Sequence, residues 1–357
     1  MIRIEPRDKI SNSSTVLIPI IAAVVSLLFA AIPLLAAGAN PFVAYVEMAK
    51  GVFGSVFAIS EMLTRATPLI YTGLAAAIAF RAKLWNIGAE GQLYLGAIAA
   101  VTVGSGFFDL PAVLLLPLII VLGGCAGAVG MAAPTYLKVR FGADEVVTTL
   151  LLNFIIIILL QMLLEGPLQD PMGLGWPQSA PILDQGMFPP LIDRMRVHSG
   201  LILAVLLAVI AHFIIKYSVW GFKLRAVGEN SAAAKHAGIN INRSLFGVAL
   251  LSGGLAGLAG VSEVAGLKGY LTADLSPGFG YAGIVVAMLA GLSPLGVLIA
   301  SVFIASVFVG ADSMSRAMGI SSFLADLVVS VSLLCVLVGG FISKFKIVRA
   351  GTGKRVK

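Results

Sequence analysis

Long apolar runs separated by short polar segments occupy almost the whole chain. A helix needs about 20 predominantly apolar residues to cross a membrane, and about ten runs are candidates. They are Val16–Ala37, Ala66–Phe80, Ile87–Gly106, Ala112–Ala133, Val146–Leu164, Leu201–Ile215, Leu245–Leu267, Tyr281–Leu292, Leu295–Gly310 and Ile320–Ile342. The pattern predicts an all-α fold, a polytopic membrane helical bundle with about ten transmembrane segments.

Two of these runs, Ala66–Phe80 and Tyr281–Leu292, are too short to cross a membrane upright. Each adjoins a glycine-rich polar break, Asn86–Gln92 for the first and Ser276–Gly283 for the second. Irregular backbone at membrane depth is tolerated only where protein covers it or where it lines a wet cavity. We therefore expect discontinuous helices beside a central path or binding site, as in transporters.

Composition excludes a soluble enzyme that carries a single membrane anchor. Of the 357 residues, 59% are hydrophobic and only 11% are charged, with a mean hydropathy of +1.02. Soluble domains carry about 25% charged residues. No polar stretch is long enough for a second folded domain, so we expect one transmembrane domain over residues 1–357. Its polar parts are an N-terminal segment, two long loops and a C-terminal tail, at 1–15, 165–199, 216–244 and 343–357.

The distribution of positive charge predicts the orientation, because Lys and Arg collect on the cytoplasmic side of membrane proteins. If the N-terminus is inside and the spans alternate, most of the 24 Lys and Arg residues fall inside. The exceptions are Lys50, Arg65, Arg194, Arg196, Lys268 and Arg316. We therefore expect both termini and the polar run Gly221–Asn242 in the cytoplasm. The net charge of +7 then needs no nucleic-acid partner.

The sequence carries no recognisable catalytic or metal-binding set. It contains no G-x-x-x-x-G-K-[ST] phosphate-binding loop, no H-E-x-x-H motif and no G-x-S-x-G motif. The three histidines lie far apart, and Cys125 and Cys335 fall in apolar runs where a disulfide is not expected. We therefore expect no catalytic residue, no metal and no cofactor in this chain.

The run Gly221–Asn242 predicts a short capped helix between apolar segments. Asn230 or Ser231 can accept the first free amide hydrogens, and two cationic side chains in the last turn suit the helix dipole. Gly238 can adopt the left-handed conformation that ends a helix. Because a helix this short is marginal in water, it either docks on a partner at the membrane surface or is an ordinary cytoplasmic loop with a helical turn.

Several polar residues fall within or beside the predicted spans. Asn86, Glu90 and Gln92 lie in or near the membrane, where a carboxylate is costly and usually faces a cavity or a partner. They either line a path or fix its bend by bonding free backbone groups, or Glu90 merely caps a helix start. Thr149 and Asn153 share one helix face, and this stripe either joins neighbouring helices or faces water.

The loop Glu165–Ser199 is the other long polar stretch, and it carries six prolines. Proline fixes one backbone angle, so a loop this rich in proline is stiff. On the predicted orientation the loop lies outside the cell. It either receives a binding protein or simply caps the ends of the helices.

Certain stretches of the chain, in order along it, carry a family resemblance. They are Leu84–Gln92 (LWNIGAEGQ), Gly142–Asn153 (GADEVVTTLLLN), Gln169–Pro181 (QDPMGLGWPQSAP), Arg225–Gly238 (RAVGENSAAAKHAG) and Ser276–Gly296 (SPGFGYAGIVVAMLAGLSPLG). The chain resembles the permeases of ATP-binding-cassette (ABC) importers for branched-chain amino acids, ribose and related solutes, and among them the nucleoside permeases of the guanosine type. Many such permeases have an EAA motif in the loop that contacts the ATPase, and here Ala232 stands where the glutamate usually does.

The resemblance implies a permease subunit that moves a small polar solute, expected to be a nucleoside, across the bacterial cytoplasmic membrane. Its implied partners are a second, related permease in a heterodimer, a separate ATPase subunit with two nucleotide-binding halves, which binds ATP, and an extracytoplasmic solute-binding lipoprotein. The residues expected along the substrate path are Asn86, Glu90, Gln92, Thr149 and Asn153. The residues expected to couple the chain to the ATPase are Arg225, Gly228, Glu229, Asn230, Ala233, Ala234 and Gly238.

Other functions fit parts of the sequence. An ion-coupled secondary transporter would explain the discontinuous helices and Glu90, but not the long basic loop with its capped helix. Riboflavin and simple-sugar permeases share the fold, so the resemblance is less specific for the solute than for the family. An intramembrane enzyme would need a nucleophile and a base, and the sequence shows no such set.

Overall fold

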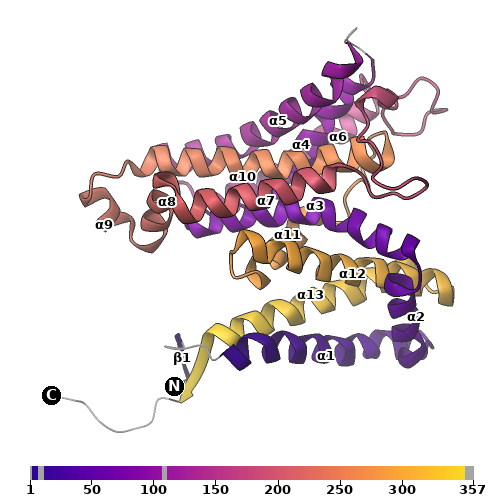
Figure 1. Cartoon of the computed structure of the whole chain (residues 1–357), viewed down its shortest axis with the longest axis horizontal. Helices are drawn as coiled ribbons and strands as arrows, with labels where there is room; N and C mark the ends of the chain where they lie inside the picture. Colours follow the sequence, from indigo (N-terminus) through magenta and orange to yellow (C-terminus); the bar gives the residue numbers. More distant parts are fainter. Residues whose placement is uncertain (1, 7–11, 107–110, 350–357) are drawn as a thin grey trace. The chain divides into compact units, whose positions relative to one another are not determined.

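The computed structural model describes residues 2–6, 12–106 and 111–349. The chain divides into two compact units. The terminal unit comprises Met1–Gly51 and Gly310–Lys357, and the central unit comprises Val52–Val309. Helices make up most of both units, as the sequence predicts (Figure 1).

The terminal unit is built from helices near both ends of the chain. In it α1 (Asn12–Ala36) packs against α13 (Ser322–Lys344). Most of α2 (Pro41–Phe53) and the end of α12 (Pro294–Met318) belong to the same unit. Its core contains Ala30, Leu34, Ala39, Ala44, Met314 and Val328.

A short sheet accompanies the helices of the terminal unit. Strand β1 (Ile2–Pro6) pairs antiparallel with β2 (Phe345–Arg349), with Ile2 opposite Arg349. Residues near the two ends of the chain therefore lie together, a pairing that the apolar pattern of the spans does not predict.

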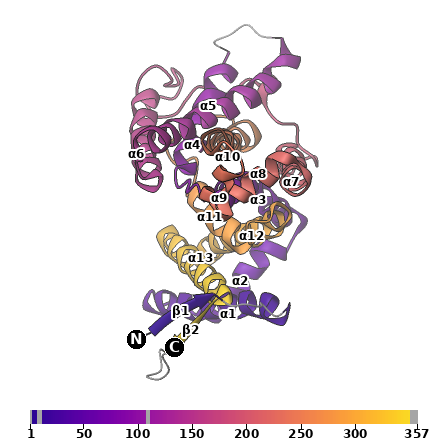
Figure 2. The same cartoon turned by 90° about the vertical axis from the view of Figure 1, so that its left-hand side faces the viewer.

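The central unit contains the other helices. They are α3 (Val56–Arg81), α4 (Ala89–Gly104), α5 (Ala112–Phe141), α6 (Glu145–Leu164), the 3-10 turn η1 (Asp184–Gly186), α7 (Gly200–Tyr217), α8 (Val219–Glu229), α9 (Ser231–His236), α10 (Ile241–Glu263), the π-helix η2 (Val264–Lys268) and α11 (Phe279–Leu289). Seen end-on, α4 and α10 lie in the middle, with α5, α6 and α7 around them (Figure 2).

Small residues let α4, α5 and α10 approach backbone to backbone. A Cβ atom at Gly96 would lie 2.1 Å from the carbonyl oxygen of Gly257, and one at Gly260 would lie 1.9 Å from that of Leu93. A Cβ atom at Gly127 of α5 would lie 2.3 Å from a carbonyl oxygen of α10. Van der Waals packing of this kind holds membrane helices together where lipid removes the hydrophobic driving force.

The helices identify the chain as an integral membrane protein. In the described residues, seven helices are long and apolar enough to cross a membrane, or eight if α1 and α2, which are bent by 117°, form one span. Helices α4 and α11 are shorter than these spans, and each follows a non-helical segment. The predicted count of ten crossings therefore stays a prediction.

The start of one predicted span lies far from the start of the observed helix. The short span predicted at Ala66–Phe80 is wrong, because α3 runs without a break from Val56 to Arg81. Its first half contains polar residues such as Ser60 and Thr64 that are buried against protein rather than exposed to lipid. Hydropathy alone therefore placed the start of this helix too late.

The loop Glu165–Ser199 packs over one end of the central unit. The Ser179 N–H donates to the carbonyl of Leu271 at 2.9 Å, and the Phe188 N–H donates to that of Ala265 at 2.7 Å. The loop thus covers η2 and the segment that follows it, which agrees with the capping role weighed for the loop. Its contact with a binding protein stays a prediction.

His198 anchors the end of this loop. The side chain is 2% exposed, its ring stacks on Phe188 with 5.6 Å between centroids, and its Nδ1 accepts a hydrogen bond from the Gly200 N–H at 3.2 Å. Burial lowers the pKa of His198 to about 4. The imidazole is therefore neutral at neutral pH and acts here as a packed aromatic ring.

Replacing Gly260 with Ala should destabilise the central unit, because the new methyl group would meet the Leu93 carbonyl. Overpacking of this kind reduces stability by about 1–3 kcal/mol. The matched control is Gly124→Ala on α5, whose Cβ would lie 3.6 Å from its nearest neighbour, an ordinary contact distance. Thermal unfolding of the purified protein in detergent should show a lower melting temperature for Gly260→Ala than for the wild type and for Gly124→Ala. Equal melting temperatures for the two variants would contradict the backbone contact.

Candidate functional site

Two helices of the central unit begin after non-helical segments that are far apart in sequence. Residues 82–88 separate α3 from α4, and residues 269–278 precede α11. A Cβ atom at Gly280, in the first turn of α11, would lie 2.3 Å from the backbone nitrogen of Glu90, in the first turn of α4. The starts of the two helices are therefore in direct contact.

The carboxylate of Glu90 bridges these two helix starts, and we call this contact the Glu90 junction. The side chain is buried, and its Oε2 accepts a hydrogen bond from the Gly280 N–H at 2.7 Å. Free N–H groups and the positive end of the helix dipole make a helix N-terminus favourable for an anion. Because Glu90 lies in the first turn of α4 and bonds the first turn of α11, both helices favour negative charge at this point.

Asn86 and Gln92 hold the segment before α4 in place. The Asn86 Nδ2 donates to Gln92 Oε1 at 2.8 Å and to Ser252 Oγ at 2.9 Å, and Asn86 Oδ1 accepts from Gln92 Nε2 at 2.9 Å and from the Gly88 N–H at 3.0 Å. The Ser252 hydroxyl donates in turn to the Ala75 carbonyl at 2.8 Å. Both amide side chains are buried, so this satisfied network fixes the bend between α3 and α4.

Thr149 and Asn153 on α6 supply further partners for the same segment. Asn153 Oδ1 accepts from the Gly91 N–H at 2.9 Å, and its Nδ2 donates to the Ile87 carbonyl and the Tyr281 hydroxyl, both at 3.1 Å. The Ile87 N–H reaches Thr149 Oγ1 at 3.3 Å. Both side chains are fully buried. Of the two roles weighed for this stripe, the structure therefore shows contact with neighbouring segments.

The residues predicted along the substrate path thus gather around the Glu90 junction. Their partners Ser252, Gly280 and Tyr281 were not predicted, although Gly280 and Tyr281 fall in the polar break Ser276–Gly283 that marked this region as unusual. One sequence does not show which distant segments pair. In the residues that the structure describes, no cluster of three or more His, Cys, Asp or Glu could hold a metal ion. Contact of the predicted path residues with a solute stays a prediction.

The predicted capped helix is α9. The side chain of Asn230, rather than that of Ser231, accepts from the Ala233 N–H at 3.0 Å and caps the start of the helix. Gly238 follows the last turn with φ 82°, and its N–H bonds the carbonyl of Lys235 at 3.0 Å. The helix therefore ends in the left-handed conformation that the sequence predicts.

The residues predicted to contact an ATPase lie on α8, between α8 and α9, on α9 and just after it, at one end of the central unit (Figure 1). The exposed members are Glu229, Asn230, Ala233 and Gly238, and the half-buried or buried ones are Arg225, Gly228 and Ala234. The Arg225 guanidinium donates to the carbonyl of Ile215, which joins α8 to α7. The exposed set is available to a partner, whereas the buried set holds α8 and α9 on the bundle.

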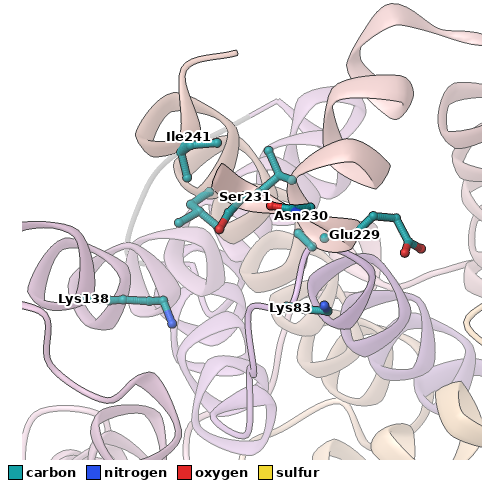
Figure 3. A pocket seen from close by; sticks show the side chains of 10 residues that line it. Lys83, Lys138, Glu229, Asn230, Ser231 and Ile241 are labelled. Atoms are coloured by element: carbon teal, nitrogen blue, oxygen red, sulfur yellow. The ribbon is translucent and has the colours of Figure 1, made fainter. Parts of the chain in front are cut away.

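A pocket of 430 Å³ lies at the base of α9 (Figure 3). Lys83 enters it from the connection between α3 and α4, and Lys138 enters it from α5. Lys138 also forms an ion pair with Glu145. Glu229 lines the pocket as well, so the pocket adds depth and charged groups of both signs beside the exposed face of α9.

Residues 58–337 match the family described as branched-chain amino acid transport system / permease component. The chain belongs to this family. The matched region includes both the Glu90 junction and α9. The resemblance seen in the sequence is therefore confirmed.

Relatives cover nearly the whole chain. It is 36% identical to the guanosine ABC transporter permease protein NupP of Bacillus subtilis, over 92% of this chain and 94% of that one. It is 33% identical to the glucose ABC transporter permease protein TsgB13 of Haloferax volcanii, over 97% of this chain and 93% of that one. It is 33% identical to the nucleoside ABC transporter permease protein NupB of Lactococcus lactis, over 86% of each chain.

Bacillus subtilis and Lactococcus lactis each have a second permease that is similar to this chain at lower identity. The permeases NupQ of Bacillus subtilis and NupC of Lactococcus lactis are 27% and 26% identical to this chain. All of these relatives are transport components, and the chain is accordingly a permease subunit rather than an enzyme.

Replacing Glu90 with Gln should impair transport more than assembly. The amide keeps an acceptor for the Gly280 N–H but removes the charge that two helix starts favour, an effect that corresponds to about a tenfold loss of solute uptake. Uptake into proteoliposomes and the yield of assembled protein measure the two properties separately. The control Glu165→Gln changes an exposed residue after α6 and should alter neither. Normal uptake by Glu90→Gln would show that the buried charge is incidental.

Proposed function

We propose that this chain is the membrane-spanning permease subunit of an ABC importer that moves a small polar solute, and that the solute is a nucleoside. The observation that carries the solute assignment is the nearly full-length similarity to permeases named for guanosine and for nucleosides. The exposed, capped α9 supports a partner at the membrane surface, because a helix of 6 residues is marginal without one.

In the proposed orientation both termini are cytoplasmic. The pairing of β1 with β2 supports an arrangement with both ends on one side. Basic residues at the α9 end of the central unit support placing that end in the cytoplasm; they include Arg81, Lys138, Arg140, Lys216 and Lys235. The shorter α4 and α11, added to the eight spans counted by length, would complete the predicted ten crossings.

The proposed importer has three further components. A second permease completes a heterodimer, which the paired names NupP with NupQ and NupB with NupC support. An ATPase subunit with two nucleotide-binding halves binds ATP, and a solute-binding lipoprotein delivers the nucleoside from outside. The assembly lies in a bacterial cytoplasmic membrane.

In this importer, binding of ATP to the ATPase displaces α9 and switches the path between outward and inward access. The permease performs no covalent chemistry. Its two packed arrangements differ in stability, and each ligand shifts their populations by its difference in affinity for the two states. The path residues predicted around the Glu90 junction then rearrange between the states.

A simple sugar is the second candidate solute. The glucose permease TsgB13 of Haloferax volcanii matches over 97% of this chain, more than either nucleoside permease. Solute competition distinguishes the two. We expect unlabelled guanosine, and not glucose, to compete with radiolabelled guanosine for uptake.

The direct test is uptake of radiolabelled guanosine by proteoliposomes that contain the permease with its partner permease, ATPase and binding protein. Uptake should require ATP and all four components. Uptake driven by an ion gradient without the ATPase would instead establish a secondary transporter and overturn the proposal.

Replacing Gly238 with Val should uncouple ATP hydrolysis from uptake. A β-branched residue is strained at a φ of 82° by about 1–2 kcal/mol, so α9 would fray and uptake per ATP would fall by about tenfold. The control Gly319→Val places the same strain after α12, where φ is 64° and the space is also open. Both variants should lose similar stability, and coupled turnover by Gly238→Val at the level of the control would count against docking through α9.

A further inference from the structure

Helix α8, which leads into α9, contacts α3 with no side chain between the two backbones. A Cβ atom at Gly228 of α8 would lie 2.0 Å from the carbonyl oxygen of Arg81, the last residue of α3. Protein interiors are close-packed and transmit strain. A displacement of α8 toward α3 must therefore move Arg81 as well.

Helices α3 and α11 lie side by side and run in the same direction (Figure 1). The Thr72 hydroxyl donates to the carbonyl of Phe279 at 3.0 Å. One residue later on α3, a Cβ atom at Gly73 would lie 2.7 Å from the side chain of Val286, farther along α11. The two helices thus form a closely packed parallel pair over the length of α11.

The Arg81 guanidinium joins the ends of this pair. Its Nη2 donates to the carbonyl of Leu292 at 2.8 Å, in the turn that follows α11. Leu292 has a φ of 61°, a left-handed conformation that leucine rarely adopts. Such a backbone persists only where its surroundings constrain it, and the bond from Arg81 is one such constraint.

We propose that Arg81 is a positioning residue that makes α11 follow α8, so that a displacement of α9 reaches the Glu90 junction at the other end of α11. This inference rests on the proposed function, in which α9 contacts the ATPase. With its 11 residues, α11 spans about 15 Å. One short, rigid helix therefore separates the turn held by Arg81 from the Gly280 N–H that bonds Glu90.

The guanidinium of Arg81 is not needed to pack the two helices together. The contacts of Thr72 and Gly73 with α11 lie more than two turns away from it along α3. Removing the hydrogen-bond donors of Arg81 should therefore free the end of α11 while the pair stays folded. A variant without these donors therefore tests whether Arg81 transmits movement to α11 without also testing whether Arg81 is needed for folding.

The experiment compares Arg81→Met, which keeps an apolar stem but no donor, with Arg140→Met, which removes an exposed charge from the last turn of α5. Each variant is reconstituted with the partner permease, ATPase and binding protein, and guanosine uptake and ATP hydrolysis are measured together. A second readout is thiol labelling at Pro277→Cys, an exposed position just before α11, in a background with Cys125→Ser and Cys335→Ser.

We expect Arg81→Met to assemble and to hydrolyse ATP, with uptake per ATP reduced about tenfold, the size of effect expected for losing a hydrogen bond from a charged donor. The change in labelling on addition of ATP should be lost as well. Arg140→Met should match the wild type in both readouts. Arg81→Lys, which retains a donor for the Leu292 carbonyl, should recover part of the coupling.

Wild-type coupling and labelling in Arg81→Met would overturn the inference while leaving the proposed function intact. If Arg81→Met does not assemble, Arg81→Lys decides the matter, because a folded but fully uncoupled Arg81→Lys would contradict the hydrogen bond as the cause. Absence of ATP-dependent guanosine uptake in the wild type would instead overturn the proposed function, and with it this inference.

Discussion

The hydrogen bond between the Glu90 carboxylate and the Gly280 N–H is the interaction on which the arrangement of the central unit depends. A buried carboxylate is unfavourable unless something compensates its charge. Here the compensation comes from the starts of two helices, which meet because α4 and α11 both begin after non-helical segments. The two helix starts compensate the buried Glu90 carboxylate, and the carboxylate in turn joins the two helix starts.

The polar side chains and close helix contacts around this junction hold its irregular backbone within protein, away from lipid. Asn86, Gln92 and Asn153 satisfy backbone and side-chain groups that a continuous helix would satisfy internally. Glycines on α4, α5 and α10 bring these helices into backbone contact. The central unit thus has a closely packed framework around its polar centre.

Much of this could be predicted from the sequence, and the reasons differ from residue to residue. The caps of α9 are local, since Asn230 and Gly238 act within a few residues, and local chemistry is readable in one chain. The short α11 was also readable from its apolar run. The full length of α3 was not readable, because its polar residues Ser60 and Thr64 are buried. Ser60 accepts a hydrogen bond from the Val197 N–H, which is far away in the sequence. The pairing of Glu90 with Gly280 spans 190 positions, and no local pattern encodes it.

The most direct test is a cryo-EM structure of the assembled transporter in its nucleotide-free and ATP-bound states. We predict that Glu90 bonds the start of α11 in at least one state, and that α3 and α11 shift together between the two. A structure in which the Glu90 carboxylate contacts water or lipid in both states, with the starts of α4 and α11 apart, would contradict the central claim.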